Sequence, residues 1–344
     1  MDHELAAVLA EYDEFAGEVT LQPWLGRAGF SGADVWQVAS ARGRFAVRRW
    51  PPGQPNPPRR AWLHRFLRFV RDCGLDVIAA PLKTRSGATF VERGGRSWEV
   101  APWLPGVADF HAAPSAARLA AAASTLAHFH ELASRFPPGP ARGPSPGLAD
   151  RSALLQHLLH GEADRLREAV LRHSAAHVLA PVALRLLDLF PQAVPRVAAE
   201  LARVAATPVP LFPCLRDIWH DHVLFTGDRV TGLIDYGALR TDTAAGDVAR
   251  LLGSLVGDDP AGWQAGCAAY ASRRAWAPGE QELLTAFDQS AVLLAGLQWV
   301  RWVFVDEIHF GDLVQVEQRM NDWAHRLARL IDQPRENCTF PFSR

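Results

Sequence analysis

Residues 214–247 decide how the rest of the chain is interpreted, and their sequence is CLRDIWHDHVLFTGDRVTGLIDYGALRTDTAAGD. Asp217 lies in a predicted loop, and Asp235 ends the second of two short predicted strands joined by a turn at Gly227. Phosphoryl transfer requires one carboxylate that orients or deprotonates the attacking hydroxyl group, and another that holds a magnesium ion on the phosphates. A hairpin would bring the two carboxylates together, so the spacing predicts both groups.

Upstream of this stretch, short strands rich in aromatic and β-branched residues lie on both sides of one helix. The helix, residues 61–73, has apolar side chains on one face and arginines on the other, and it ends at Gly74. A short surface helix is predicted at residues 5–15. The predicted strands are residues 21–25, 34–39, 44–50, 89–92 and 97–101.

From residue 115 onward, apolar positions recur mostly at helical spacing. A composition change near Pro105 and Gly106 marks the predicted boundary between two lobes. The predicted helices are residues 116–132, 152–173, 177–189, 193–205, 280–305 and 314–331, and the predicted strands 223–225 and 230–234 interrupt them.

The composition excludes several classes of protein. With 344 residues, of which 49% are hydrophobic, the chain has enough apolar material for a large core. A net charge of -1 gives no basic face for nucleic acid. The four cysteines are too scattered for a zinc ribbon or a disulfide framework, and the N-terminus lacks the pattern of a secretory signal. We therefore expect a cytoplasmic protein with no nucleic-acid or membrane partner.

The order and spacing of the residues in 214–247 resemble those of the aminoglycoside phosphotransferase family, which is related to choline and homoserine kinases and to protein kinases. That family has a His-Gly-Asp opening, an Asn five residues after the Asp, and an Ile-Asp-Phe-Gly-like segment whose Asp lies thirteen residues further on. Here the first Asp is Asp217, His222 occupies the Asn position, and Asp235 is the second Asp. The resemblance implies that Asp217 is the catalytic base, Asp235 the main magnesium ligand and His222 a second possible ligand.

The family's phosphate-binding lysine and its acidic partner are both altered. Arg48 stands where the family has a lysine that contacts the phosphates, and Lys83, the sole lysine, lies in a separate segment. Arginine can hold phosphate, but its planar fork is not interchangeable with an ammonium group. Residues 54–70 contain no acidic residue, so the helix cannot supply the glutamate that pairs with that lysine, and the ion pair is absent or replaced. His64 could face the site or belong to the core.

The loop residues depart from the family pattern as well. A neutral imidazole at His222 is a softer donor that suits Mn²⁺ better than Mg²⁺, and it could instead bind a phosphate oxygen or pack in the interior. Leu215 replaces the family's histidine, so packing must brace the loop. Asp247 matches a later aspartate that helps to hold the helical lobe in the family.

Two further segments resemble the family's nucleotide-binding elements. Residues 26–32 match its glycine-rich loop, which implies that the backbone at Gly29 and Gly32 approaches phosphate, although an ordinary hairpin turn gives the same pattern. Residues 101–106 match its hinge. The resemblance implies that the Pro102 carbonyl accepts from the adenine amine and that the Leu104 N–H donates to the adenine ring.

These observations predict an α+β, two-lobe, protein-kinase-like fold with a small antiparallel-sheet lobe (residues 1–100), a hinge (101–106) and a mainly helical lobe (107–344). The predicted function is ATP-dependent phosphorylation of a small molecule at a hydroxyl group, with Mg²⁺ or Mn²⁺. One alternative is a degenerate, nucleotide-binding pseudokinase or scaffold. Another is a kinase that acts on a protein side chain.

The sequence leaves the identity of the phosphate acceptor open. A polycation such as an aminoglycoside requires an acidic pocket, for which Asp258, Asp259 and the acidic residues of 306–312 are candidates. Aromatic residues of the last helices, Trp299, Trp302 and Phe304, could line that pocket or the core. Asp221, Asp228 and Asp242 are interpreted as solvated loop residues.

Overall fold

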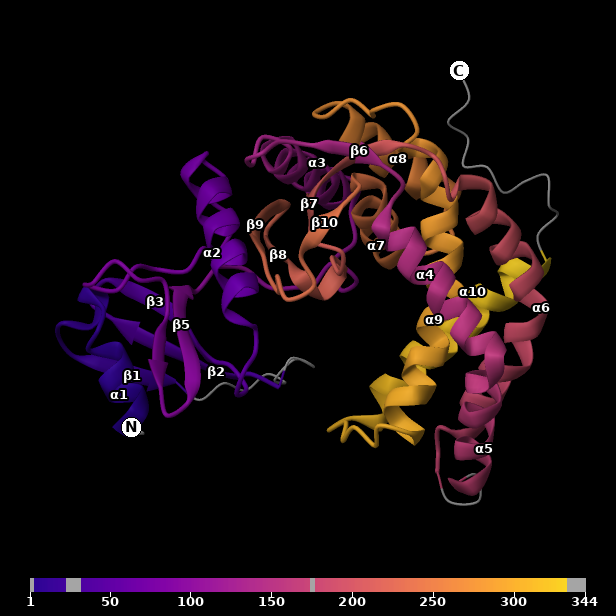
Figure 1. The fold of residues 1–344 in the computed structure, drawn as a ribbon, viewed down its shortest axis with the longest axis horizontal. Helices are drawn as coiled ribbons and strands as arrows, with labels where there is room; N and C mark the ends of the chain where they lie inside the picture. The colour runs from indigo at the N-terminus through magenta and orange to yellow at the C-terminus, as the bar shows by residue number, and fades with distance from the viewer. Residues whose placement is uncertain (1–2, 23–31, 174–176, 333–344) are drawn as a thin grey trace. The chain divides into compact units, whose positions relative to one another are not determined.

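The computed structural model describes residues 3–22, 32–173 and 177–332 (Figure 1). Its contacts divide the chain into two compact units. The first comprises Met1–Pro138 and His220–Leu239, and the second comprises Gly139–Trp219 and Arg240–Arg344. Residues 220–239, which include His222 and Asp235, therefore belong to the same unit as the N-terminal part of the chain. The hinge at residues 101–106 stays a prediction.

The first unit is built on a five-stranded antiparallel sheet with the strand order β1-β2-β3-β5-β4 (Figure 1). This confirms the predicted order of three strands, a helix and two strands. The first strand covers earlier residues than predicted, and residues 23–25 of that prediction lie outside the described residues. The strands are β1 (Val19–Gln22), β2 (Asp34–Ser40), β3 (Gly43–Arg49), β4 (Val91–Arg93) and β5 (Arg96–Pro102).

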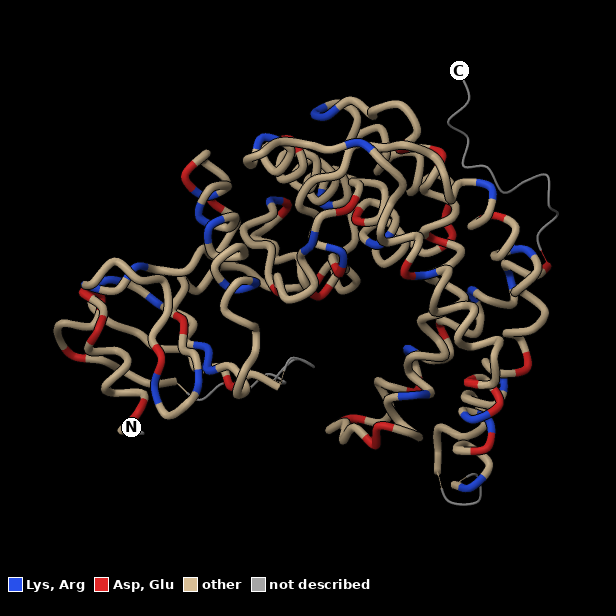
Figure 2. Tube along the Cα trace, viewed as in Figure 1, with Lys and Arg blue, Asp and Glu red and all other residues tan. Residues whose placement is uncertain are grey.

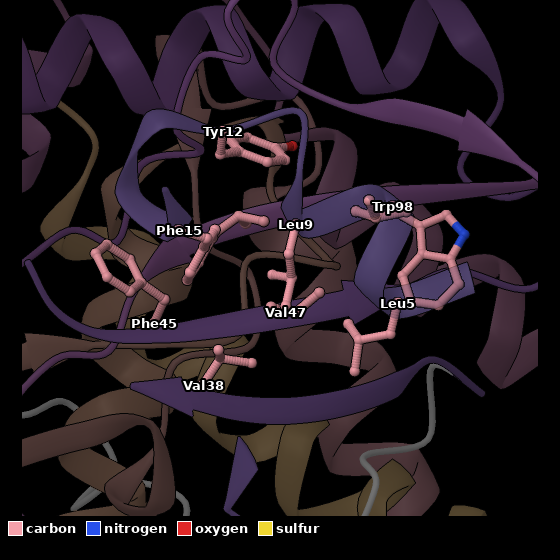
Figure 3. Packing of buried hydrophobic residues seen from close by; sticks show 10 residues of the cluster. Leu5, Leu9, Tyr12, Phe15, Val38, Phe45, Val47 and Trp98 are labelled. Atoms are coloured by element: carbon pink, nitrogen blue, oxygen red, sulfur yellow. The ribbon is translucent and has the colours of Figure 1, made fainter. Parts of the chain in front are cut away.

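One face of this sheet is covered by the N-terminal helix α1 (His3–Leu9) and the turn that follows it. Figure 3 shows Leu5 and Leu9 packed against Val47 and Trp98, and all four side chains are buried. Side chains alternate along a strand, so Arg48 and Glu99, the neighbours of Val47 and Trp98, lie on the opposite face. The apolar pattern of β3 and β5 thus places two charged groups on the same side of the sheet.

The helix between the third and fourth strands is α2 (Pro57–Asp72). It begins four residues earlier than predicted because the side chain of Asn56 caps it, accepting from the Arg59 N–H at 2.9 Å. Two prolines then fit the first turn, where no N–H partner is needed. Phe66 of α2 packs edge to face on Phe129 of α3 (Ala116–Ala133), with 5.7 Å between the ring centroids.

The predicted hairpin is confirmed as β8 (Val223–Thr226) and β9 (Arg229–Leu233). Two sets of backbone hydrogen bonds attach it to the first unit. The Leu233 N–H donates to the Val77 carbonyl at 2.8 Å, and Val107 and Phe225 exchange hydrogen bonds of 3.0 and 2.9 Å. The hairpin is therefore fixed to the segments on either side of β4 and β5.

The second unit is mainly helical and contains a small antiparallel sheet with the order β10-β7-β6. This sheet was not predicted, because its strands are short and prolines interrupt the strand pattern. Its strands are β6 (Ala141–Gly143), β7 (Val209–Cys214) and β10 (Arg240–Asp242). The helices are α4 (Pro146–His157), α5 (Ala163–His173), α6 (Ala180–Val204), α7 (Ala244–Leu255), α8 (Pro260–Ala271), α9 (Leu284–Phe304) and α10 (Leu313–Asp332).

Three helix predictions were wrong in detail. The helices predicted at 177–189 and 193–205 form the single helix α6, which contains Pro191 and Pro195. Both prolines are exposed, while buried residues on the other face, such as Phe190, hold the helix together by packing. The helix predicted at 152–173 is instead interrupted at Gly161, whose φ of 106° is not helical.

The segment Gln281–Phe304, which includes α9, is long and apolar enough to cross a membrane by length and composition. However, 72% of its most apolar window is buried inside the structure, as in the core helix of a packed protein. Figure 2 shows acidic and basic residues interspersed along the described part of the chain.

Candidate active site

Asp217 lies in the loop that follows β7, and buried hydrogen bonds hold the start of this loop. The carboxylate of Asp247, in the first turn of α7, accepts from the Leu215 N–H at 2.7 Å and from the Arg216 N–H at 2.6 Å. Leu215 is itself buried. The loop that lacks the family's histidine is thus braced by packing, as expected, and also by Asp247.

Arg216 stands where the family pattern has glycine, and its φ of 65° lies in the left-handed region. A side chain in that region costs about 1–2 kcal/mol. Ion pairs offset this cost, because the Arg216 guanidinium lies 2.6 Å from Asp150 and 3.3 Å from Asp242. The arginine therefore fixes a backbone conformation that glycine would adopt without strain.

The interpretation of Asp242 as a solvated loop residue was wrong. Its side chain is buried at the end of β10, and it accepts from the Ser145 hydroxyl at 2.7 Å and from the Thr243 N–H at 2.9 Å. Burial raises the pKa of Asp242 even though these hydrogen bonds and Arg216 favour the charged form. Pairing in the small sheet, which the sequence pattern did not reveal, is what removes this carboxylate from water.

The side chain of Asp217 contacts Arg250, which lies three residues after Asp247 on α7. The Nε and Nη2 atoms of Arg250 donate to one Asp217 carboxylate oxygen at 3.3 and 3.2 Å. The Asp217 side chain is 48% exposed. The second unit thus presents a half-exposed carboxylate on a braced loop, with a guanidinium group beside it.

His222 and Asp235 are brought together by the hairpin in the first unit. The imidazole Nε2 of His222 lies 3.8 Å from a carboxylate oxygen of Asp235, and the Ile234 N–H donates to the His222 carbonyl at 3.0 Å. Two ligand atoms that each lie about 2.1 Å from one ion can be about 3–4 Å apart. One imidazole and one carboxylate at this separation fit a single divalent cation.

The backbone around Asp235 is fixed on both sides. Asp235 itself has a φ of 62°, and its carboxylate accepts from the Gly237 N–H at 3.3 Å. The buried hydroxyl of Tyr236 donates to the Leu233 carbonyl and accepts from the Ala79 N–H at 3.0 Å. Tyr236, in the position of the family's phenylalanine, thereby anchors the segment to the first unit while the Asp235 side chain stays 47% exposed.

Arg48 lies on β3, the central strand of the five-stranded sheet. Its guanidinium pairs with Glu99 of β5, directly opposite in the ladder, with 3.3 Å between nitrogen and oxygen. The Arg48 side chain is 29% exposed and also lies over the Trp50 ring, 5.0 Å from its centroid. The acidic partner missing from the helix is therefore replaced by one from the neighbouring strand.

The helix still contributes to this ion pair, through His64. The buried His64 ring lies 2.9 Å from the second carboxylate oxygen of Glu99 and 2.8 Å from the Thr89 hydroxyl. Burial by itself would raise the pKa of Glu99, but the hydrogen bond with His64 and the charge of Arg48 outweigh it and lower that pKa. Glu99 is thus held ionised between the strand arginine and the helix.

The predicted phosphate loop is described only in part. Gly29 lies outside the described residues. Gly32 lies two residues before the start of β2 and has a φ of 65°. A Cβ atom at this position would approach the Pro51 ring to 3.4 Å. The left-handed backbone is the feature that requires glycine at this position.

The predicted adenine contacts lie at the end of β5. The Trp103 N–H donates to the Arg44 carbonyl of β3 at 2.9 Å, so the alternation of the ladder turns the Pro102 carbonyl toward the other edge. On that edge the Val100 carbonyl already accepts from the Leu82 N–H at 2.8 Å. Leu104 packs on β9, where a Cβ atom on Gly232 would come within 3.0 Å of the leucine side chain.

The described nucleotide and metal candidates, namely Gly32, Arg48, Pro102, Leu104, His222 and Asp235, all belong to the first unit, whereas Asp217 belongs to the second. A model of the phosphotransferase enzyme family matches residues 26–281 of the chain. The chain belongs to the phosphotransferase enzyme family. No curated protein matches it.

Several solved structures share the kinase-like fold of this phosphotransferase-family chain. An aminoglycoside phosphotransferase from Alicyclobacillus acidocaldarius is 21% identical, with a TM-score of 0.56 over 95% of this chain and 93% of that one. A spectinomycin phosphotransferase, solved in complex with ADP and spectinomycin, is 11% identical, with a TM-score of 0.58 over 90% and 92% of the two chains. A microcompartment-associated aminopropanol kinase is 15% identical, with a TM-score of 0.61 over 97% and 98%.

Sequence reasoning missed two charged side chains of this phosphotransferase-family chain that contact candidate site residues, Glu99 and Arg250. Glu99 could have been found by aligning β3 and β5, since Arg48 and Glu99 are cross-strand partners. Arg250 could have been suspected because it lies one helical turn after Asp247. In both cases the missing information was which charged groups face each other.

Proposed function

We propose that the protein transfers the γ-phosphate of ATP to a hydroxyl group of a small molecule. The observation that carries this proposal is the 3.8 Å approach of His222 and Asp235, on a hairpin held in the same unit as Arg48. The ADP complex of the spectinomycin enzyme, which has the same fold, supports a nucleotide as the phosphate donor. We also propose a cytoplasmic location, which was inferred from the sequence.

Each residue has a distinct task in the proposed reaction. The guanidinium of Arg48, held by Glu99, would bind phosphate oxygens through charge-assisted hydrogen bonds. A divalent cation on Asp235 and His222 would neutralise charge on the phosphates. The half-exposed carboxylate of Asp217 would orient the acceptor hydroxyl and take its proton.

In the proposed transfer one bond to phosphorus forms and one breaks. The acceptor oxygen forms a new bond to the γ-phosphorus, the bond from that phosphorus to the β–γ bridging oxygen breaks, and ADP leaves. The hydroxyl proton passes to a carboxylate oxygen of Asp217. The products are the phosphate ester, ADP and a proton that Asp217 later releases to water.

ADP release with a pool of hydroxylated metabolites, in the presence of Mg²⁺ or Mn²⁺, tests the proposal. Asp217→Asn is expected to lower kcat by about 10²- to 10⁴-fold, the usual contribution of a general base, while ATP binding persists. Asp235→Ala should lose the metal dependence of ATP binding. Asp188→Asn, at an exposed ion pair on α6, is the control and should change neither quantity. Full turnover by Asp217→Asn would refute the assigned role.

One observation favours a second function, nucleotide binding without transfer. Arg250 donates two hydrogen bonds to one oxygen of Asp217, so that oxygen is engaged by a guanidinium group rather than open to an acceptor hydroxyl. This pseudokinase alternative predicts calorimetric binding of ATP that depends on Asp235, with no ADP release from any acceptor or metal. The same two measurements therefore separate the two functions.

A further inference from the structure

Two arginines converge on Trp219, two residues after Asp217, within the second unit. The Arg250 guanidinium lies 5.7 Å from the Trp219 ring centroid and hydrogen-bonds Asp217, and the Arg319 guanidinium of α10 lies 4.9 Å from the same ring. Arg319 also lies 6.0 Å from the ring of Trp299. The surroundings of the proposed base thus combine aromatic faces with two guanidinium groups.

The acidic residues that could bind a polycation are mostly used elsewhere. Asp258 pairs with two arginines of α10, at 2.7 and 3.0 Å, and Asp259 accepts the first N–H groups of α8. Asp306 lies 3.6 Å from an arginine of α9, and Asp312 accepts an N–H in the first turn of α10. Of the five candidates only Glu307 is left without such a role among the described contacts.

We propose that the acceptor carries an anionic group, a carboxylate or a phosphate, which binds Arg250 and Arg319 beside Trp219. This inference rests on the proposed kinase function and specifies its substrate class as anionic hydroxyl compounds. The planar fork of arginine matches both anions bidentately. The bound anion would compete with Asp217 for Arg250, so the Asp217 carboxylate would be released toward the acceptor hydroxyl only when an acceptor is present.

The charge at Trp219 can be tested without any turnover, by tryptophan quenching with iodide and with caesium. The Trp219 contribution is the difference between wild type and Trp219→Phe. We expect iodide to quench this contribution at least about threefold more efficiently than caesium at equal ionic strength, since a positive surface concentrates anions. The bias should disappear in Arg250→Gln and persist in Arg250→Lys. Absence of an iodide bias overturns the proposal.

The substrate class is tested by ADP release with matched acceptors: glycerol, D-glycerate, sn-glycerol 3-phosphate and the polycation kanamycin. The anionic compounds should react in preference to glycerol and kanamycin, and the comparison of D-glycerate with the phosphate ester separates the two anions. Arg250→Gln should raise KM for the preferred anion about tenfold or more, and Arg250→Lys should restore part of it. Arg167→Gln, at an exposed ion pair on α5, is the control.

The results of these experiments distinguish the proposal of an anionic acceptor from the proposal of a kinase function. Preference for glycerol or kanamycin overturns the anionic acceptor and leaves the kinase function intact. No ADP release from any compound, combined with an iodide bias that depends on Arg250, supports the anion site and counts against the kinase function.

Discussion

The ion pair between Arg48 and Glu99 gives the most direct test of how the first unit is held together. Glu99 is 8% exposed, and its two oxygens face a guanidinium at 3.3 Å and an imidazole at 2.9 Å. Glu99→Gln keeps the shape and an acceptor for His64 but removes the charge that faces Arg48. Glu99→Leu removes both interactions.

The expected magnitudes follow from burial. Breaking a fully buried ion pair costs about 3–5 kcal/mol, and we expect that range for Glu99→Leu, which removes the carboxylate partner of Arg48 and of the buried His64 Nε2 atom. Because Arg48 is 29% exposed, solvent screens part of the charge, so Glu99→Gln should cost only about 1–3 kcal/mol. Glu131→Gln removes the ion pair between Glu131 of α3 and the exposed Arg135 and, as the control, should cost about 0.5 kcal/mol or less.

Urea unfolding followed by tryptophan fluorescence measures these costs, and amide hydrogen exchange in β3 and β5 assigns the loss to the first unit. The pKa of Glu99 is lowered in the folded state, so its contribution is present above the ordinary value of 4.5 and is lost as the pH falls through the folded pKa. The gap between wild type and Glu99→Gln should therefore narrow on acidification below pH 4.5. Equal stabilities at pH 7, or a gap that does not depend on pH, would refute this reasoning.

Three further predictions concern the loop, the phosphates and the small sheet. Asp247→Asn offers one acceptor oxygen to the two N–H groups of Leu215 and Arg216, so it should lose about 1–3 kcal/mol in urea unfolding and lower kcat more than ATP affinity; an unchanged transition would contradict this. Arg48→Gln should weaken calorimetric ATP binding about tenfold or more, and equal affinity would exclude a phosphate contact. The pKa of Asp242 is raised, so wild type should gain stability relative to Asp242→Asn as the pH falls from 7 toward its ordinary value of 3.8, in the opposite sense to Glu99. A constant difference between those two proteins across that range would show that Asp242 is not desolvated.

Much of the fold could be predicted because it depends on residues close together in sequence. Alternation of apolar side chains marks β2, β3 and β5, and Gly227 with its neighbours marks the turn between β8 and β9. The predictions failed where packing overrides local preference. Pro191 and Pro195 should end a helix, but α6 continues through them because its buried face packs along its whole length.

The candidate site divides in the same way. Spacing along the chain, together with the family resemblance, selected Asp217, His222 and Asp235, and the hairpin does bring the last two together. The partner of Arg48 was not visible, because Glu99 is 51 residues away and faces it only through the register of β3 and β5. The burial of Asp242 likewise depends on a sheet whose strands lie far apart in sequence.

The sequence by itself determined the order of strands and helix around the five-stranded sheet, the hairpin between His222 and Asp235, and the resemblance on which the family assignment was first based. Only the tertiary structure decided which charges meet: Glu99 with Arg48, Asp247 with the loop backbone, and Arg250 with Asp217. The physical reason is the separation along the chain over which each effect acts. Periodicity and turn chemistry act between neighbours in the chain, whereas the charge and proton affinity of a side chain depend on groups that long-range packing brings to within a few ångströms.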